Sequence, residues 1–380
     1  MEIFNSLDTT FRCPVGAVKE NQNIHFKIFL SKSLKCSCAK LILIDEFTNS
    51  TKSFSMFWCG DLPNNFEMWE CDFFPEHIGL YWYQFELICN GQKRVIYKGK
   101  LKKGELSEVL SSDKSFPSWQ ITVYKKDFDV PSWLSGGIMY QIFPDRFYRS
   151  KIINENVPSD RLIHTNCNDL PIWKPNTNGH VTNSDYFGGN LQGIIQKLDY
   201  LKELKVTCLY LNPIFEAHSN HRYNTANYEN IDPLLGTAND FKELCFQAKK
   251  RNIKIILDGV FSHTGSDSIY FNKEKRYKSI GAFNSKNSPY FSWYKFNLWP
   301  DKYTSWWGFN TLPEVNEMDH NYIEYITGEN GIIQKWLNLG ASGWRLDVAD
   351  ELPDEFIKKL KKSAKKAKKD SIIIGEVWED

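Results

Sequence analysis

The feature that most constrains the fold is an alternation of strand-length apolar runs and amphipathic helices from residue 136 to the end of the chain. This alternation is typical of parallel βα units, arranged as a doubly wound sheet or as a barrel. We expect strands at 138–143, 206–211, 254–258, 343–347 and 372–376, and helices near 191–204, 240–252, 322–339 and 354–369. The sequence therefore predicts an α/β unit with about five countable parallel strands.

The first hundred residues have a different pattern. Short segments rich in β-branched and aromatic residues, between 24 and 101, are separated by turn material such as Gly79 and Asn90-Gly91. This pattern is typical of an antiparallel all-β sandwich. We therefore expect a sandwich domain at 1–104, a linker at 105–135 and the α/β unit at 136–380.

Two connections in the α/β unit, 144–189 and 262–320, are too long for plain βα loops. Both follow strands, so both are expected to leave the same edge of the sheet. The second connection carries a dense set of aromatic residues: Trp293, Trp299, Trp306, Trp307 and Phe309. We interpret it as a lid or subdomain that walls a cleft.

Composition limits the classes of partner. Aromatic residues make up 15% of the 380-residue chain, whereas its net charge is only +1, which argues against an electrostatic nucleic-acid binder. The nine cysteines are scattered and lack zinc-site spacing, so free thiols in a reducing compartment are expected. No apolar stretch approaches the roughly 20 residues of a membrane span, and no signal peptide is visible. We expect a soluble cytoplasmic protein with no membrane or nucleic-acid partner.

Three of the expected strands end in an acid: Asp258, Asp347 and Glu376. Because successive strand side chains point to opposite faces, Arg345 lies on the same face as Asp347. The three carboxylates are predicted to point inward at one rim, where parallel barrels locate their chemistry.

Converging carboxylates repel, and the one in drier surroundings stays protonated. We expect Arg345 to keep Asp347 ionised, and Glu376, which follows an apolar run, to be the neutral acid. One ionised and one protonated carboxyl are what glycoside hydrolysis requires. His263 could donate to a sugar hydroxyl. From these residues alone, a structural ion pair inside the sheet remains an alternative.

Six stretches resemble the α-amylase family of glycoside hydrolases, in the branch of neopullulanases, cyclomaltodextrinases and maltogenic amylases. The resemblance runs from about residue 137 to the end of the chain, in the family's order. The stretches are YQIFPDRF at 140–147, HRYNTA at 221–226, DGVFSH at 258–263, LPEVN at 312–316, GWRLDVA at 343–349 and GEVW at 375–378.

The resemblance implies a (β/α)8 TIM barrel, here incomplete with about five strands, that follows an N-terminal β-sandwich module in the sequence. A starch-binding type is left open for this module. It implies that Asp347 is the nucleophile, Glu376 the general acid/base, and Arg345 the residue that orients the nucleophile. Tyr223, by stacking, and His263 would line the subsite of the reacting glucose. His221 and Asp258 complete the expected substrate-binding set, Asp258 with a mainly structural role.

The implied activity is retaining cleavage of α-1,4 bonds in maltooligosaccharides, cyclodextrins or pullulan. The alternatives are α-1,6 cleavage by a pullulanase or α-glucosidase, and a catalytically inactive glucan-binding fragment. Since the family's remaining barrel strands have no counterpart, we expect a truncated product. A homodimer is left open.

No cofactor is expected to be required, and no metal-ligating residue is predicted. Calcium, which some relatives bind, is left open. Asn190 stands at a position that is commonly Asp in calcium-binding relatives, and the acidic loop that would complete the site is not recognisable around 152–160.

Overall fold

The computed structural model describes residues 1–100, 102–108, 116–151, 157–159, 161–177, 179 and 181–378. The chain divides into two compact units, Met1–Asp129 and Val130–Asp380. Among the described residues, no helix is long and apolar enough to cross a membrane.

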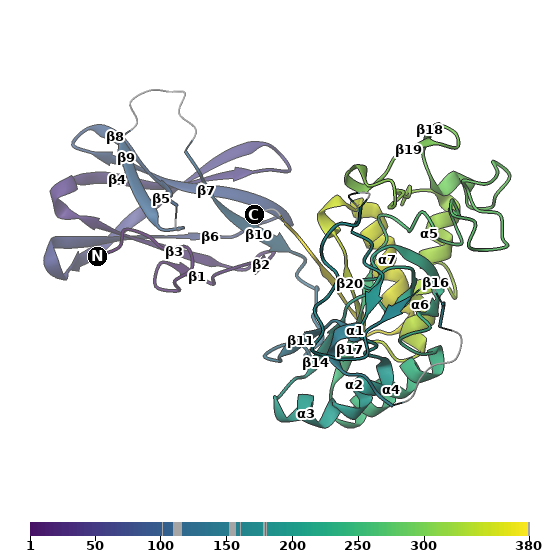
Figure 1. Cartoon of the computed structure of the whole chain (residues 1–380). Helices are drawn as coiled ribbons and strands as arrows, with labels where there is room; N and C mark the ends of the chain where they lie inside the picture. Colours follow the sequence, from purple (N-terminus) through teal and green to yellow (C-terminus); the bar gives the residue numbers. More distant parts are fainter. Residues whose placement is uncertain are drawn as a thin grey trace. The chain divides into compact units, whose positions relative to one another are not determined.

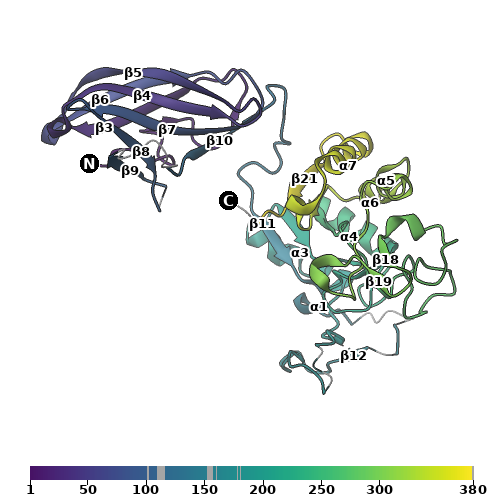
Figure 2. The same ribbon diagram turned by 90° about the horizontal axis from the view of Figure 1, so that it is seen from above.

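The first unit is built from β-strands (Figures 1 and 2). Its strands pair in the order β1-β3-β6-β5-β4-β7-β10-β2, and β8 pairs with β7 and β9. All of these pairs are antiparallel except β10 with β2. The strands are β1 (Arg12–Cys13), β2 (Val18–Lys19), β3 (Ile24–Ser31), β4 (Cys36–Asp45), β5 (Ser50–Leu62), β6 (Phe66–Phe73), β7 (Gly79–Cys89), β8 (Gln92–Lys98), β9 (Gly104–Glu108) and β10 (Trp119–Tyr124).

Alternation along these strands explains the core of the first unit. In β3, every second residue from Ile24 to Leu30 is buried, and the same period recurs in β4 and β7. The stretch predicted as a linker, 105–135, differs from expectation because it contains most of β9 and all of β10. Trp119 and Ile121 of β10 join the sandwich core, which extends the unit to Asp129.

The second unit contains a five-stranded parallel sheet, ordered β11-β14-β17-β20-β21. The strands are β11 (Met139–Ile142), β14 (Cys208–Leu211), β17 (Lys254–Gly259), β20 (Gly343–Leu346) and β21 (Ile372–Gly375). All five lie within the predicted segments or one residue beyond them. This sheet confirms the predicted architecture, in which an all-β domain is followed along the chain by an incomplete barrel.

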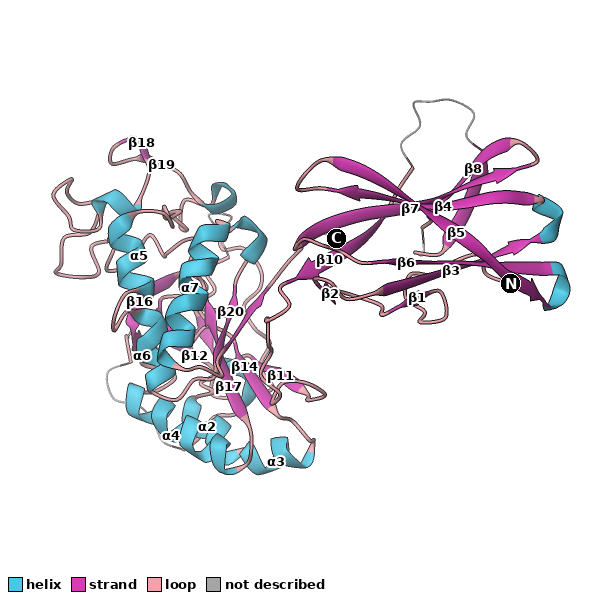
Figure 3. Cartoon of the chain, turned by 180° about the vertical axis from the view of Figure 1, so that it is seen from behind, coloured by secondary structure: helices cyan, strands magenta, loops and turns pink. Residues whose placement is uncertain are grey.

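Helices cover one face of this sheet (Figure 3). They are α2 (Leu191–Gln196), α3 (Leu198–Glu203), α4 (Ala238–Lys250), α5 (His320–Thr327), α6 (Ile332–Asn338) and α7 (Asp354–Ala367). Trp344 and Leu346 of β20 are buried in the core beneath these helices, so the other face of β20 is left for Arg345. On α7, Phe356, Leu360 and Ala364 are buried, and their spacing of four residues forms an apolar stripe on one face of the helix.

Two helices predicted as single elements are divided. The helix expected near 191–204 is interrupted at Lys197, where ψ is 3°. The helix expected near 322–339 breaks between α5 and α6, where Asn330 has a φ of 61° between Gly328 and Gly331. Residues with left-handed or glycine backbones end helices readily, and tertiary packing selects the break.

The two long connections carry short elements of their own. The first contains α1 (Pro144–Phe147), β12 (Leu162–Ile163) and β13 (Asp185–Tyr186), and a hairpin of β15 (Phe215–Ala217) and β16 (Thr225–Ile231) follows β14. The second contains β18 (Phe296–Leu298), β19 (Lys302–Tyr303) and the 3₁₀ turns η3 (Phe291–Trp293) and η4 (Trp306–Gly308).

The two ends of the first connection, at Pro144 and Gly189, approach each other so closely that a glycine is required at position 189. A Cβ at that position would lie 2.1 Å from the carbonyl oxygen of Pro144.

Candidate active site

The expected carboxylates meet at the carboxyl ends of three neighbouring strands. Asp258 of β17 is paired in register with Arg345 of β20. Asp347 and Glu376 each follow directly after the last residue of β20 and β21, whose final residues are paired with each other. Strand alternation therefore puts all three carboxylates at one rim, as the sequence predicts.

One guanidinium binds all three acids. Arg345 Nη1 donates to Asp258 Oδ1 and to Asp347 Oδ1, at 2.8 Å in both cases. Its Nη2 forms an ion pair with Glu376 Oε2 at 2.6 Å. The backbone N–H of Val348 also donates to Glu376 Oε2, at 3.2 Å. With every acid ionised, three negative charges would share one positive charge.

The pKa of Asp347 departs from the expectation. Burial and the charge of Asp258 raise the pKa of Asp347 to about 7, although Arg345 opposes the rise. The expectation that Arg345 keeps Asp347 at a low pKa is wrong, because the guanidinium is shared three ways. The expectation that Glu376 lies in the drier surroundings is also wrong, since its side chain is 30% exposed and that of Asp347 only 10%.

Asp258 is the most enclosed of the three acids. Its side chain is fully buried, and its Oδ2 accepts hydrogen bonds from the hydroxyls of Tyr210 and Tyr223. With Arg345 on Oδ1, both oxygens are occupied, and burial raises the pKa of Asp258. These contacts suit an anchor that orients Arg345 and Tyr223.

The two histidines support Tyr223 from either side. His263 Nε2 donates to the carbonyl oxygen of Tyr223 at 3.1 Å, so its Nδ1 is the acceptor from Ser262 Oγ at 3.0 Å. His221 Nδ1 accepts the Tyr223 N–H at 3.1 Å. Burial lowers the pKa of both histidines to about 4. Both rings are therefore neutral near pH 7, and their contacts with a sugar stay predictions.

Sequence reasoning missed several residues that complete this site. The Tyr210 hydroxyl binds Asp258, Asn212 Nδ2 donates to the Tyr223 hydroxyl at 3.2 Å, and Gln141 Nε2 donates to Asn212 Oδ1 at 3.0 Å. Tyr210 looks like an ordinary core residue within an apolar strand. The available signal was strand alternation: Tyr210 is paired with Ile256 of the next strand, and Ile256 lies on the same face as Asp258.

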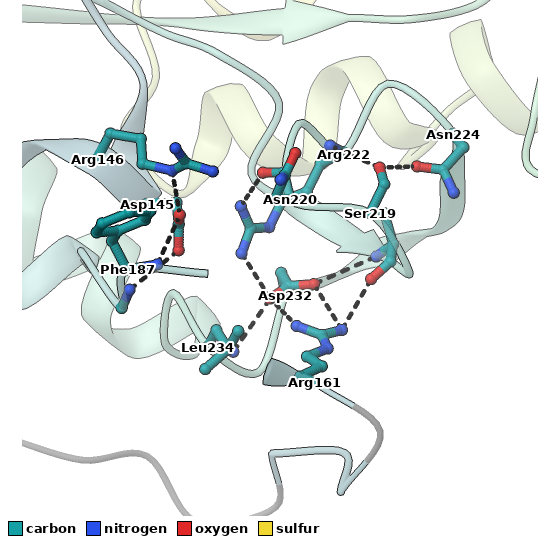
Figure 4. Close-up of polar contacts among 12 residues, drawn as sticks. Asp145, Arg146, Arg161, Phe187, Ser219, Asn220, Arg222, Asn224, Asp232 and Leu234 are labelled. Carbon is teal, nitrogen blue, oxygen red and sulfur yellow. Dashed lines mark hydrogen bonds and ion pairs between the residues drawn. The ribbon is translucent and has the colours of Figure 1, made fainter. Parts of the chain in front are cut away.

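A second, separate charge cluster secures the loops around the site (Figure 4). Arg161 binds Asp232 in a bidentate pair at 2.7 and 3.0 Å, and Arg222 binds the same carboxylate at 3.1 Å. Burial disfavours the charged form, yet the two guanidinium groups outweigh it and hold the pKa of Asp232 below its usual value. Because Arg222 precedes Tyr223, this cluster fixes the segment that carries Tyr223.

Asp145 performs a similar task in the first long connection. Its buried carboxylate accepts the backbone N–H groups of Phe187 and Gly188, at 3.0 and 3.1 Å, and pairs with Arg146 (Figure 4). The two ends of the 144–189 connection are therefore tied together.

The expectation about calcium concerns Asn190 and the loop at 152–160. No group of three or more His, Cys, Asp or Glu side chains that could hold a metal is present in the described part of the chain. Asn190 Oδ1 instead accepts the Gly193 N–H at 2.8 Å, as the N-cap of α2. The loop at 152–160 falls mostly outside the described residues, so the expectation about calcium stays a prediction.

The fold and the site together define a parallel-barrel protein with converging carboxylates at the rim of its strands. Residues 141–380 match the family described as alpha amylase, catalytic domain, and the chain belongs to this family. The resemblance inferred from the sequence motifs is confirmed.

Individual relatives show which members of this family the chain resembles. The chain is 37% identical to an amylopullulanase from Thermoanaerobacterium thermosulfurigenes over 98% of its own length and 22% of that protein. It is 35% identical to a cyclomaltodextrinase from Thermoanaerobacter pseudethanolicus, over 67% of the chain and 42% of that protein. A solved cyclomaltodextrinase structure matches with a TM-score of 0.61 and 25% identity, covering 100% of this chain and 60% of that one. The chain spans less than half the length of these two curated relatives.

Proposed function

We propose that the protein hydrolyses α-1,4 glycosidic bonds of α-glucans with retention of configuration. The observation that carries this proposal is the binding of Asp347 and Glu376 to neighbouring nitrogens of one guanidinium. Two carboxyl groups held this close, from equivalent ends of adjacent strands, suit a nucleophile and an acid that act on one sugar. We expect the two carboxyl groups to be about 5–5.5 Å apart, the spacing of retaining enzymes.

In the first step, a carboxylate oxygen of Asp347 attacks the anomeric carbon of the bound glucosyl unit. The bond between that carbon and the glycosidic oxygen breaks, and Glu376 gives its proton to the departing oxygen. A covalent glycosyl-enzyme on Asp347 results. In the second step, Glu376 takes a proton from water, the water oxygen bonds to the anomeric carbon, and Asp347 is released.

The proposed reaction requires one of the two acids that share Arg345 to hold a proton. The charge of Glu376 contributes to the raised pKa of Asp347, after burial and the charge of Asp258. The productive form has the proton on Glu376 and the charge on Asp347. Because Glu376 is the more exposed of the two, it can receive this proton from solvent and reach the glycosidic oxygen.

The names of the relatives support the choice of substrate. The similarity to a cyclomaltodextrinase supports cyclodextrins and maltooligosaccharides as substrates of this protein. The similarity to an amylopullulanase, which aligns with 98% of this chain, supports pullulan as a second candidate substrate. Product analysis after incubation with pullulan separates α-1,4 cleavage from α-1,6 cleavage. Panose as the product indicates α-1,4 cleavage, and maltotriose indicates α-1,6 cleavage. Maltotriose as the main product would overturn the α-1,4 assignment. Binding without any new reducing ends would favour a glucan-binding protein without catalysis.

The finer assignments for the rest of the molecule belong to the same proposal. We assign the sandwich unit a starch-binding role, supported by a surface cavity lined by Phe54, Phe73, Phe74 and Tyr81. We expect Phe74→Ala to reduce retention on immobilised amylose, and unchanged retention would contradict this role.

We also place the protein in the cytoplasm, supported by its nine free cysteines, and expect a homodimer. Light scattering of the purified protein tests the dimer, and a monomer mass would contradict it.

A further inference from the structure

The connection between β19 and α5 presents three aromatic rings side by side, which we call the aromatic platform: Trp306, Trp307 and Phe309. The rings of Trp306 and Trp307 are 5.1 Å apart and 18° from parallel, and those of Trp306 and Phe309 are 6.3 Å apart and 27° from parallel. Trp307 is 73% exposed and Phe309 is 55% exposed. Large aromatic rings rarely lie this open without a binding role when they are grouped.

A single carboxylate fixes the orientation of both indoles. Trp306 Nε1 donates to Glu351 Oε2 at 2.8 Å, and Trp307 Nε1 donates to Glu351 Oε1 at 2.9 Å. Glu351 lies in η5 (Ala349–Glu351), four residues after Asp347. The polar edge of each indole is therefore satisfied by protein, while the exposed ring face of Trp307 remains open to a ligand.

The backbone of Trp307 is itself unusual. Its φ of 48° and ψ of 27° are in the left-handed region, which bulky residues rarely adopt. Such a conformation costs free energy, and it persists only where the surroundings hold it in place. Here the Glu351 bond and the Trp306 stack hold the ring, so the strained residue presents its face instead of turning inward.

The platform is continuous with the active site. The Trp306 ring packs on the His263 ring at 5.2 Å and 31°. His263 donates to the Tyr223 carbonyl, and the Tyr223 hydroxyl donates to Asp258. A series of direct contacts, from Trp306 through His263 and Tyr223 to Asp258, therefore connects the platform with the carboxylates.

We propose that the aromatic platform is a sugar subsite, on which one glucosyl unit of the same α-glucan chain stacks against Trp307. This proposal rests on the proposed function, since it takes its ligand from the reaction at Asp347 and Glu376. The apolar face of a glucosyl ring matches a flat indole, and fixed rings lose little conformational freedom on binding. Glu351 acts as a positioning residue that holds the indoles.

The test measures the affinity of the full chain for maltopentaose by calorimetry in a Glu376→Gln background, which prevents consumption of the ligand. Trp307→Ala should weaken binding about tenfold, the loss expected for an aromatic contact. Trp307→Phe, which keeps a ring, should lose less. Trp58→Ala, which removes a 55% exposed indole from the first unit, is the matched control and should leave the affinity at these sites unchanged.

Each outcome decides the proposal. Unchanged affinity in Trp307→Ala, with the Glu376→Gln parent binding well, overturns the subsite and leaves the proposed function standing. Failure of the parent to bind any α-glucan overturns both. Equal losses in Trp307→Ala and Trp307→Phe would contradict ring stacking. Glu351→Gln should give an intermediate loss, because its amide accepts only one of the two indole N–H groups.

Discussion

Two buried charge clusters in the second unit use the same residue types in opposite proportions. Around Asp232, two guanidinium groups surround one carboxylate, and the pKa of that carboxyl is held below its usual value. Around Arg345, three carboxylates surround one guanidinium, and the pKa of Asp347 rises to about 7. Burial opposes ionisation in both clusters, so the count of opposite charges decides the result.

This difference separates a structural cluster from the one to which we assign the proposed reaction, the reactive cluster. Excess positive charge keeps Asp232 anionic near pH 7 and fixes its loops. In the reactive cluster, burial and excess negative charge raise the pKa of Asp347, as is common for groups at functional sites. Substitutions in both clusters test this difference.

The largest effect is expected on turnover. Asp347→Asn removes the attacking oxygen charge and should lower kcat at least about 10³-fold, because several kcal/mol of transition-state stabilisation are lost. Reducing-end assays on maltooligosaccharides measure it. Asp354→Asn, on the exposed first turn of α7, is the control and should keep full turnover. Comparable activity in both variants would remove Asp347 from the reaction.

A loss of stability is expected at the structural cluster. Asp232→Asn leaves two buried guanidinium groups without their counter-charge and should cost about 3–5 kcal/mol in the free energy of unfolding. Urea denaturation followed by circular dichroism measures it. Asp199→Asn removes an exposed bidentate pair with Arg251 and should change stability little. Equal stability of the two variants would show that the Asp232 cluster is not structural.

The opposite sign is expected at the reactive cluster. Because the folded pKa of Asp347 is about 7 and lies above its usual value of 3.8, the folded state binds the extra proton between these values. This group therefore costs stability progressively as pH rises from about 4 to 7. Asp347→Asn should be more stable than the parent at pH 8, by on the order of 1–4 kcal/mol, and should lose this advantage near pH 4. Stability curves that stay parallel across pH would contradict the raised pKa.

The smallest effect is expected at the anchor Asp258. Tyr210→Phe removes one of its hydrogen-bond donors and should cost about 1 kcal/mol of stability. Thermal unfolding measures this cost, and Tyr200→Phe, at a 48% exposed tyrosine on α3, is the control. If both variants unfold at the same temperature as the parent, Tyr210 does not support the site.

Some of these features follow from the sequence because they depend on strand geometry alone. The alternation in β20 puts Arg345 and Asp347 on one face and Trp344 on the other, and the structure agrees. Gly343 lies on the same face as Arg345, and position 343 is a glycine for a steric reason, since a Cβ there would lie 2.5 Å from the Ile372 carbonyl oxygen. Local period and size are readable without knowledge of the tertiary fold.

Other features depend on contacts that sequence does not specify. Trp293 was expected to wall a cleft but is buried in the core, because aromatic residues serve cores and clefts equally well. Glu351 stands out only once Trp306 and Trp307 are seen to share its two oxygens. The raised pKa of Asp347 was not expected, because it depends on burial and on how many acids share Arg345, which no single strand reveals.

The most direct test of the central claim is covalent trapping. The Glu376→Gln protein is incubated with a fluorinated α-glucosyl fluoride, whose leaving group needs no acid and whose glycosyl-enzyme is hydrolysed slowly. Tandem mass spectrometry then locates the added sugar. The account predicts one glycosyl unit on the peptide that contains Asp347. A label on Asp258 or any other residue, or no label at all, would contradict it.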